Sequence, residues 1–337
     1  MTPTDHIRPP LSGSPPAVTV VEITDPTTAN ETIEVLDQEV VQLGTQRLRA
    51  RRVSVRLESA LVLYHRTNLR VRTRTSVNRE LVAYGACGPR AAGTANGLPM
   101  RSGTMLAVRP GTEVVFVSEP GYESVFALLE PDEIDTHLRG RQQENAFRMP
   151  RGAEILRREP ASVRRFFEWG KRLVDTAARR PGLFNDRRET RVAAQVELLE
   201  TLLAALGAAT DLQPPRSDRK RLAQSRIVKI AEDHALSSVG DRLYLTDLCR
   251  AAGVSERALE YAFKEIMGMT PTAYLTRVRL HRVRKALQAL TRASTTVSAE
   301  ALNQGFWHFG DFSRAYRECF GELPSQTLRR TAADARR

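Results

Sequence analysis

Near its C-terminus the chain repeats one pattern of glycines, aromatic residues and prolines at nearly constant spacing. Gly253 and Gly305 lie 52 residues apart, and the Gly-x-x-Pro sequences that begin at Gly268 and Gly321 lie 53 apart. In each copy a small residue precedes the first glycine by four positions, and an amphipathic stretch runs from that glycine to the Gly-x-x-Pro. A short helix, a turn and a second helix have this pattern. The repeat therefore predicts two helix-turn-helix units, which are typical of proteins that read DNA.

In the first copy, caps and an apolar stripe mark two short helices. Thr246 and Ser255 are suited to cap them, since a hydroxyl oxygen accepts hydrogen bonds from free N–H groups. Gly253 suits the turn, whose conformation a Cβ disfavours. Apolar residues at helical spacing are then expected to face inward, namely Leu259, Phe263 and Met267 in the first unit and Phe312, Tyr316 and Phe320 in the second.

Between the two copies, residues 274–290 read as a single helix. One face is apolar and the others carry positive charge. The inward residues are expected to be Leu280, Val283, Leu287 and Leu290, and the residues on other faces Arg277, Arg279, Arg282, Arg284 and Lys285. A rigid helix here would fix the separation of the two units.

Positive charge is concentrated in the same region. Residues 214–337 hold 22 Lys or Arg against 13 Asp or Glu, a net charge of +9 out of +12 for the whole chain. A basic surface attracts polyanions, so DNA, RNA and anionic membranes are candidate partners. An arginine-rich composition inherited from a GC-rich genome would explain the excess without any partner.

Residues 305–325, GFWHFGDFSRAYRECFGELPS, resemble the signature of the AraC/XylS family of bacterial transcription regulators. The sequences Gly-Met-Thr-Pro at 268–271 and Arg-Leu at 279–280 add to this resemblance, which covers about residues 220–330. It implies a seven-helix module whose two recognition helices enter successive major grooves of double-stranded DNA. It also implies contact with RNA polymerase, with activation as the commoner mode. The GFWH and FGELPS sequences resemble a subgroup that includes ethanolamine-utilisation regulators.

The resemblance also implies which positions contact DNA. Base contacts are expected of Arg257, Glu260 and Tyr261 in the first unit and of Ser313 and Arg314 in the second. Phosphate contacts, or solvated charges and helix pairing, are expected of Ser255, Lys264, Arg279, Arg282, His308 and Arg317. Trp307 has two interpretations, a partly buried core residue or an aromatic ring that stacks on a base.

The first half of the chain has a different character. Residues 1–17 are rich in Pro, Ser and Thr and are expected to be disordered. Residues 18–150 alternate short β-branched runs with Gly, Pro and Asn, which favours a β-sandwich or barrel. The segment 103–113 resembles the cupin-like effector domain of AraC-type regulators. The resulting fold class is α+β, with a cupin-like domain followed by an all-α DNA-binding domain.

Residues 151–213 have helical periodicity and are expected to form a linker or dimerisation segment. A stripe in this segment is either a buried face within the chain or the seam of a homodimer. Its residues are Val192, Val196, Leu199, Leu203 and Leu206. The polar, proline-containing sequence 213–218 is the expected linker to the DNA-binding domain, residues 220–330.

The sequence holds little that points to catalysis, a metal or export. Three cysteines argue against a disulfide scaffold, and the N-terminus lacks the apolar core of a signal peptide. The β region has only His65 and His137 and no His-x-His pair, so we expect neither a metal nor a cofactor. These observations favour a cytoplasmic protein that is not an enzyme.

Two hypotheses for function follow. In the first, a small-molecule effector binds the N-terminal domain and controls a sequence-specific DNA-binding regulator. In the second, the N-terminal domain binds no ligand and serves only dimerisation or protein contact. An enzyme with an attached DNA-binding module is a distant third.

Overall fold

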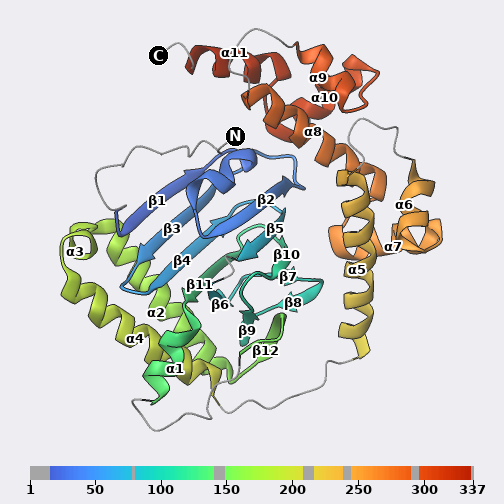
Figure 1. The fold of residues 1–337 in the computed structure, drawn as a ribbon. Helices are drawn as coiled ribbons and strands as arrows, with labels where there is room; N and C mark the ends of the chain where they lie inside the picture. The colour runs from blue at the N-terminus through green and yellow to red at the C-terminus, as the bar shows by residue number, and fades with distance from the viewer. Residues whose placement is uncertain are drawn as a thin grey trace, which may run out of the picture.

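The computed structural model describes residues 16–77, 80–139, 149–207, 216–237, 244–289 and 296–334. Most of the expected disordered lead (1–17), the first half of the expected linker (213–218) and Leu290 lie outside these ranges, and the second half of the linker begins a helix at Arg216. The chain has a sheet-rich N-terminal part and a helical C-terminal part, joined along a broad contact (Figure 1).

The N-terminal part consists of two antiparallel sheets packed face to face (Figure 1). The seven-stranded sheet has the order β1 (Val18–Ile23), β3 (Ala50–Arg56), β4 (Ala60–Thr67), β11 (Glu123–Leu129), β6 (Val82–Cys87), β9 (Thr104–Val108) and β12 (Ala153–Arg157). The five-stranded sheet has the order β2 (Leu36–Gln42), β5 (Val71–Val77), β10 (Glu113–Ser118), β7 (Gly93–Ala95) and β8 (Leu98–Met100). A 3-10 helix, η1 (Pro26–Thr32), joins β1 to β2.

Strand β5 shows how the sequence selects the two faces of a strand. Its side chains alternate, so Val71, Thr73 and Thr75 face the interior between the sheets. Arg72 and Arg74 point to the opposite face, where they meet acidic side chains of the C-terminal part. The five-stranded sheet therefore has an inner face that lines the sandwich and an outer face that contacts the helical part.

Helices cover the outer face of the seven-stranded sheet (Figure 1). They are α1 (Pro131–Arg139), α2 (Pro160–Arg179), α3 (Gly182–Asn185) and α4 (Arg188–Leu206). The segment that we expected to be helical from residue 151 begins with strand β12, which pairs with β9. Residues 153–157 therefore belong to the sheet, because antiparallel pairing with β9 provides hydrogen-bond partners for their backbone N–H and C=O groups.

The apolar stripe that we expected along α4 divides between the core and the surface. Leu199 and Leu206 are buried in the core of this chain, and Leu203 is half-buried against it. Val192 and Val196 are 41% and 48% exposed. Leu199 and Leu206 thus belong to the intrachain core and not to a seam, and the surface left for a partner carries the two valines.

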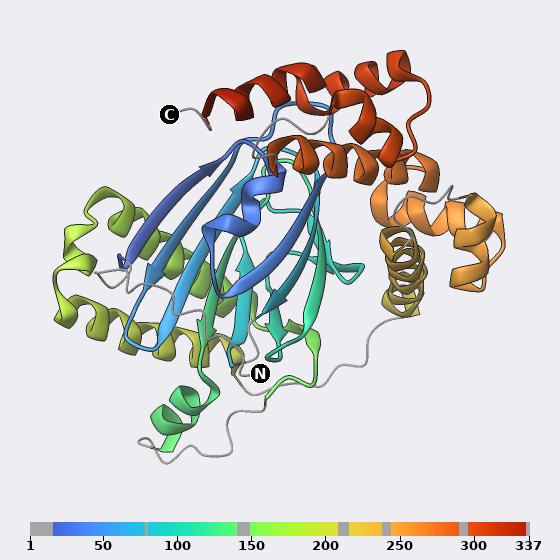
Figure 2. The same cartoon turned by 45° about the horizontal axis from the view of Figure 1, so that its top comes forward.

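The C-terminal part contains two helix pairs joined by one long helix, with one further helix before them and one after them. Its helices are α5 (Arg216–Ser237), α6 (Leu245–Ala252), α7 (Glu256–Met267), α8 (Pro271–Ala289), α9 (Val297–Asn303), α10 (Phe309–Phe320) and α11 (Pro324–Asp334). Helix α8 runs across the ends of the strands and connects the two pairs (Figure 2). Each pair has its own apolar core, to which one half of α8 contributes.

A buried ion pair joins α5 to the outer face of the five-stranded sheet. The Arg72 guanidinium and the Glu232 carboxylate are 2% and 3% exposed, and Arg72 Nε donates to Glu232 Oε1 at 2.6 Å. The hydroxyl of Tyr274 in α8 donates to the same carboxylate. The Glu232 carboxylate of α5 therefore contacts both the sheet and α8.

We expect replacement of Glu232 by Ala to lower the free energy of unfolding by about 3–5 kcal/mol, because it leaves the Arg72 charge buried without its carboxylate. Denaturant unfolding measures this change. Asp233→Ala is the matched control, since Asp233 pairs with Arg74 but is 45% exposed, and it should cost about 0–1 kcal/mol. Similar losses in the two variants would contradict a structural role for the buried pair.

Candidate nucleic-acid interface

The first helix pair, α6 and α7, turns at Gly253. Its φ of 65° lies in the left-handed region, as the sequence predicts. The Ser255 hydroxyl accepts from the backbone N–H of Ala258 at 3.4 Å and caps α7. The predicted Thr246 cap is wrong, because α6 begins at Leu245. The N-cap is Tyr244, whose backbone N–H donates to the Asp247 carboxylate at 3.0 Å.

The outer face of α7 carries the polar residues that we predicted to read bases. Arg257, Glu260 and Lys264 are exposed, while the predicted inward stripe of Leu259, Phe263 and Met267 is buried. Tyr261 is half exposed, and the Lys220 ammonium lies 5.0 Å from the centre of its ring. Lys220 comes from α5 and adds a positive charge that the sequence analysis did not place here.

The second pair, α9 and α10, turns at Gly305 with a φ of 76°. His308 occupies the N-cap of α10, although its side chain makes no capping hydrogen bond. Arg314 and Arg317 are exposed, and Ser313 is half-buried. Arg314 also pairs with Asp311 at 3.3 Å, but both side chains are largely exposed, so this pair leaves the guanidinium available.

Two predicted phosphate contacts lie on α8 with different surroundings. Arg279 is half-buried beside the Gly305 turn. Arg282 donates through Nη2 to the carbonyl oxygen of Leu236 at 2.7 Å and so ties α8 to the end of α5. Arg282 thus has a role within the domain that its position in a basic helix does not reveal.

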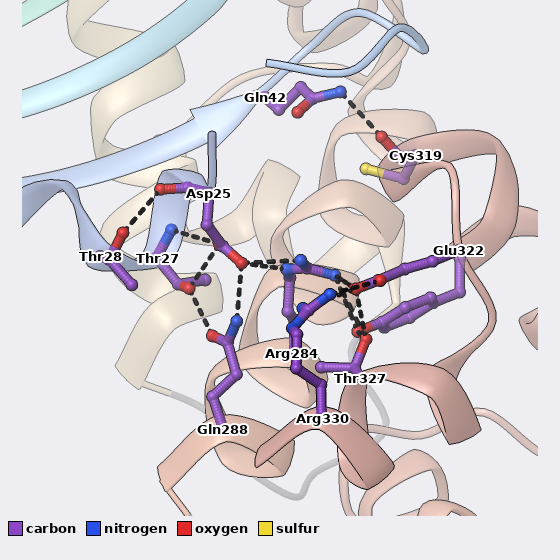
Figure 3. Close-up of polar contacts among 11 residues, drawn as sticks. Asp25, Thr27, Thr28, Gln42, Arg284, Gln288, Cys319, Glu322, Thr327 and Arg330 are labelled. Atoms are coloured by element: carbon purple, nitrogen blue, oxygen red, sulfur yellow. Dashed lines mark hydrogen bonds and ion pairs between the residues drawn. The ribbon is translucent and has the colours of Figure 1, made fainter. Parts of the chain in front are cut away.

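Arg284, which we expected on an outer face of the same helix, is buried between the two parts of the chain. Its guanidinium contacts the Asp25 carboxylate at 2.7 Å and the Glu322 carboxylate at 2.8 Å (Figure 3). Two acidic partners compensate the buried positive charge. Burial alone would raise the pKa of Asp25, but hydrogen bonding and the charge of Arg284 lower it to about 2.

The Arg284 cluster connects η1 to the second helix pair. Asp25 caps η1 and also accepts from the Gln288 amide at 2.6 Å. On the other side, Glu322 follows α10, and Arg330 of α11 donates to it at 2.8 Å (Figure 3). A few charged groups therefore link the N-terminal part to α8, to the turn after α10 and to α11.

The end of β2 makes a second contact with these helices. The backbone N–H of Gln42 donates to Nε2 of His281 at 3.0 Å. Its side-chain amide donates to the carbonyl oxygen of Cys319, near the end of α10, at 2.8 Å (Figure 3). Both groups are buried, so this contact fixes α10 relative to the sheet.

A cavity of about 90 Å³ lies between the two sheets. Its walls are mostly aliphatic and aromatic, with hydroxyl groups from β5 and two basic side chains, Arg52 and His65, from neighbouring strands. Arg52 Nη1 donates to the carbonyl oxygen of Ala29 in η1 at 2.8 Å. Nδ1 of His65 has no hydrogen-bond partner among the described residues, and burial with the charge of Arg52 lowers the pKa of His65 to about 3.

Neither metal chemistry nor a membrane span is indicated within the described ranges. They contain no group of three or more His, Cys, Asp or Glu side chains placed to hold a metal ion. None of their helices is both long and apolar enough to cross a bilayer.

Comparison with known proteins identifies the helical part. A family model described as a helix-turn-helix domain matches residues 248–330. A probable AraC family transcriptional regulator from Rhodopseudomonas palustris is 36% identical over 31% of this chain and 96% of that chain, with a TM-score of 0.29. The helix-turn-helix domain of this chain belongs to the AraC family. This is a family of DNA-binding transcriptional regulators, not of enzymes.

Curated relatives match the same AraC-type domain. The XylDLEGF operon transcriptional activator 3 of Pseudomonas putida is 37% identical over 105 residues, which are 31% of this chain and 30% of that protein. The probable thc operon regulatory protein of Rhodococcus erythropolis is 35% identical over 103 residues, 31% of each protein. The chain thus spans less than a third of these relatives. These names do not include an ethanolamine regulator, so that finer resemblance stays a prediction.

The contact between the AraC-type domain and β2 should weaken in acid because His281 is buried without charge. Burial lowers its pKa to about 3, with Asp25 opposing and Arg284 and Arg277 adding to the shift. The pKa of a histidine in an unfolded chain is about 6.5. Between these values the unfolded chain binds a proton that the folded chain does not, so stability falls as pH falls.

We expect His281→Gln to reduce this pH dependence by up to about 1.4 kcal/mol per pH unit between pH 6 and 4. Denaturant unfolding at a series of pH values measures the slope. His308→Gln, at an exposed position of the AraC-type domain, is the control and should leave the slope unchanged. An unchanged slope in the His281 variant would show that this side chain is not kept neutral by the fold.

Proposed function

We propose that this protein is a transcription regulator that binds double-stranded DNA in a sequence-specific manner and is controlled by a small molecule. Two helix-turn-helix motifs would read the DNA, and a cupin-like N-terminal domain would hold the effector. The observation that supports this function best is the pair of exposed polar helices, α7 and α10, carried by the single helix α8.

DNA reading is assigned to the outer faces of α7 and α10. In a helix-turn-helix motif the second helix enters the major groove with its N-terminal residues against the bases. Arg257 suits the O6 and N7 acceptors of guanine, and Glu260 suits the N4 donor of cytosine. The positive charge of Lys264, Lys220 and Arg317 favours phosphates. Because its relatives are named transcriptional activators, we propose activation through RNA polymerase.

Effector control is assigned to the cavity between the sheets. The inner face of β5 lines that cavity, while its outer face holds Glu232 through Arg72. Similarly, η1 is held to the cavity residue Arg52 through Ala29 and to α8 through Asp25. A ligand that changes either wall would shift the contacts with the DNA-binding domain, provided that it binds one arrangement more tightly than the other.

The alternative is a regulator whose N-terminal domain binds no ligand and serves only dimerisation or protein contact. The exposed Val192 and Val196 on α4 favour a homodimer contact there. A homodimer contact on α4 is compatible with an effector in the cavity, because the two sites use different faces. The alternative is therefore distinguished by a cavity that binds no ligand.

The base-reading role of Arg257 has a direct test. Arg257→Ala should cost roughly 1–3 kcal/mol of binding free energy and relax the preference at one base position. Selection from random DNA followed by affinity measurements would detect both effects. Lys264→Ala, on the same helix, should weaken binding to all DNA sequences alike and reduce the dependence of the affinity on salt concentration. Failure of the wild-type chain to enrich any motif would argue against the proposed function.

Thermal-shift screening of the full chain against small metabolites tests effector control. A ligand at about 100 times its Kd should add about 2.7 kcal/mol to the stability. His65→Leu should reduce this stabilisation while DNA affinity without ligand stays unchanged, because His65 lines the cavity and not the helical part. If no metabolite stabilises the chain, the ligand-independent alternative gains support.

A further inference from the structure

The turn of the second helix pair is one residue longer than that of the first. From the N-cap onward the two units keep a spacing of 53 residues, which pairs Ser255 with His308 and Gly268 with Gly321. The turn glycines, Gly253 and Gly305, are only 52 apart. The second turn therefore has to accommodate an additional residue before α10.

Trp307 is the residue that this longer turn leaves on the surface. Phe306 takes the core position, with its ring 5.0 Å from that of Phe312. Trp307 is 58% exposed, and Phe309, the first residue of α10, is 43% exposed. Leu302 of α9 is exposed nearby in the chain. The interpretation of Trp307 as partial core is thus wrong, and apolar side chains gather at the N-terminal end of α10.

The first unit has different chemistry at the corresponding end of its second helix. The position of Arg257 in α7 corresponds to Gly310 in α10. No atom lies within 4 Å of the place where a Cβ of Gly310 would be, so nothing fills this space. Where α7 offers a charged hydrogen-bond donor, α10 offers a glycine next in sequence to the exposed Phe309.

Arginines lie on the elements next to these aromatic residues. Nη1 of Arg279 lies 3.9 Å from the place where a Cβ of Gly305 would be. Arg314 and Arg317 are exposed on later turns of α10, and Arg314 pairs with the exposed Asp311 of the first turn. Apolar side chains near exposed arginines suit a groove whose walls are phosphates and whose floor carries methyl groups.

We infer that Trp307 and Phe309 contact thymine methyl groups in the major groove, so that the second unit reads its half-site by apolar contact. The C5-methyl of thymine is the one apolar group that bases present in that groove. This inference rests on the proposed function. It predicts half-sites of unequal character, with hydrogen-bonded bases under α7 and thymines under α10.

Replacing thymine by uracil in the DNA tests the inference, because it removes only the methyl group. The full chain is used, with the site obtained by selection from random DNA and each thymine replaced in turn. Burial of one methyl is worth about 0.8 kcal/mol, so each contacted thymine should lower affinity about fourfold when replaced. The effect should be confined to one half-site.

Protein variants identify the residues that sense the methyl group. Trp307→Ala and Phe309→Ala should weaken binding to the thymine site and abolish the difference between thymine and uracil. Leu323→Ala is the matched control, since Leu323 is equally apolar and 39% exposed but follows the C-terminal end of α10. Circular dichroism would show whether each variant retains its helices.

The outcomes separate this inference from the proposed function. Sequence-specific binding that is indifferent to uracil at every position would overturn the inference and leave the function standing. Absence of any enriched sequence would overturn the function itself. Unchanged DNA binding by Trp307→Ala together with reduced transcription would assign the aromatic surface to a protein partner and would also overturn the inference.

Discussion

The arrangement of the two parts depends on the buried pair of Arg72 and Glu232. Separating the two charges would leave each of them buried without a partner, so the pair favours contact between the sheet and α5. Tyr274 extends the same carboxylate contact to α8. Since α8 carries both helix pairs, the positions of both candidate DNA-reading helices depend on this charge pair, whose Arg72 also contacts the Met267 sulfur at the C-terminal end of α7 at 3.8 Å.

The five-stranded sheet serves two purposes because its side chains alternate. Thr73 and Thr75 line the interior cavity, while Arg72 and Arg74 hold the helical part. Neighbouring residues of β5 alternate between the face that lines the cavity and the face that contacts the helical part. The 3-10 helix adds a second connection of the same kind through Asp25 and Arg284. The same backbone segments thus carry side chains that line the cavity and side chains that contact the helical part.

The sequence predicted the features of the fold that depend only on residues close together in the chain. The turn glycines and the inward stripes recur in both units and could be predicted from spacing, and the Ser255 cap could be predicted from its residue type. The burial of Arg284 could not, because its partner Asp25 lies 259 residues away and an arginine in a basic helix resembles a solvated one. On α4, the predicted stripe contains only two of the seven buried residues, Leu199 and Leu206, since packing against the rest of the domain determines which side is covered.

The contact made by Gln42 is with backbone groups and not with the side chains of α10. It reaches the carbonyl oxygen of Cys319, a group that every residue type possesses at that position. The exposed positions of α10 can therefore change without loosening the attachment of the helix to the sheet. Side-chain substitutions there leave the hydrogen bond between β2 and α10 in place, because its acceptor belongs to the main chain.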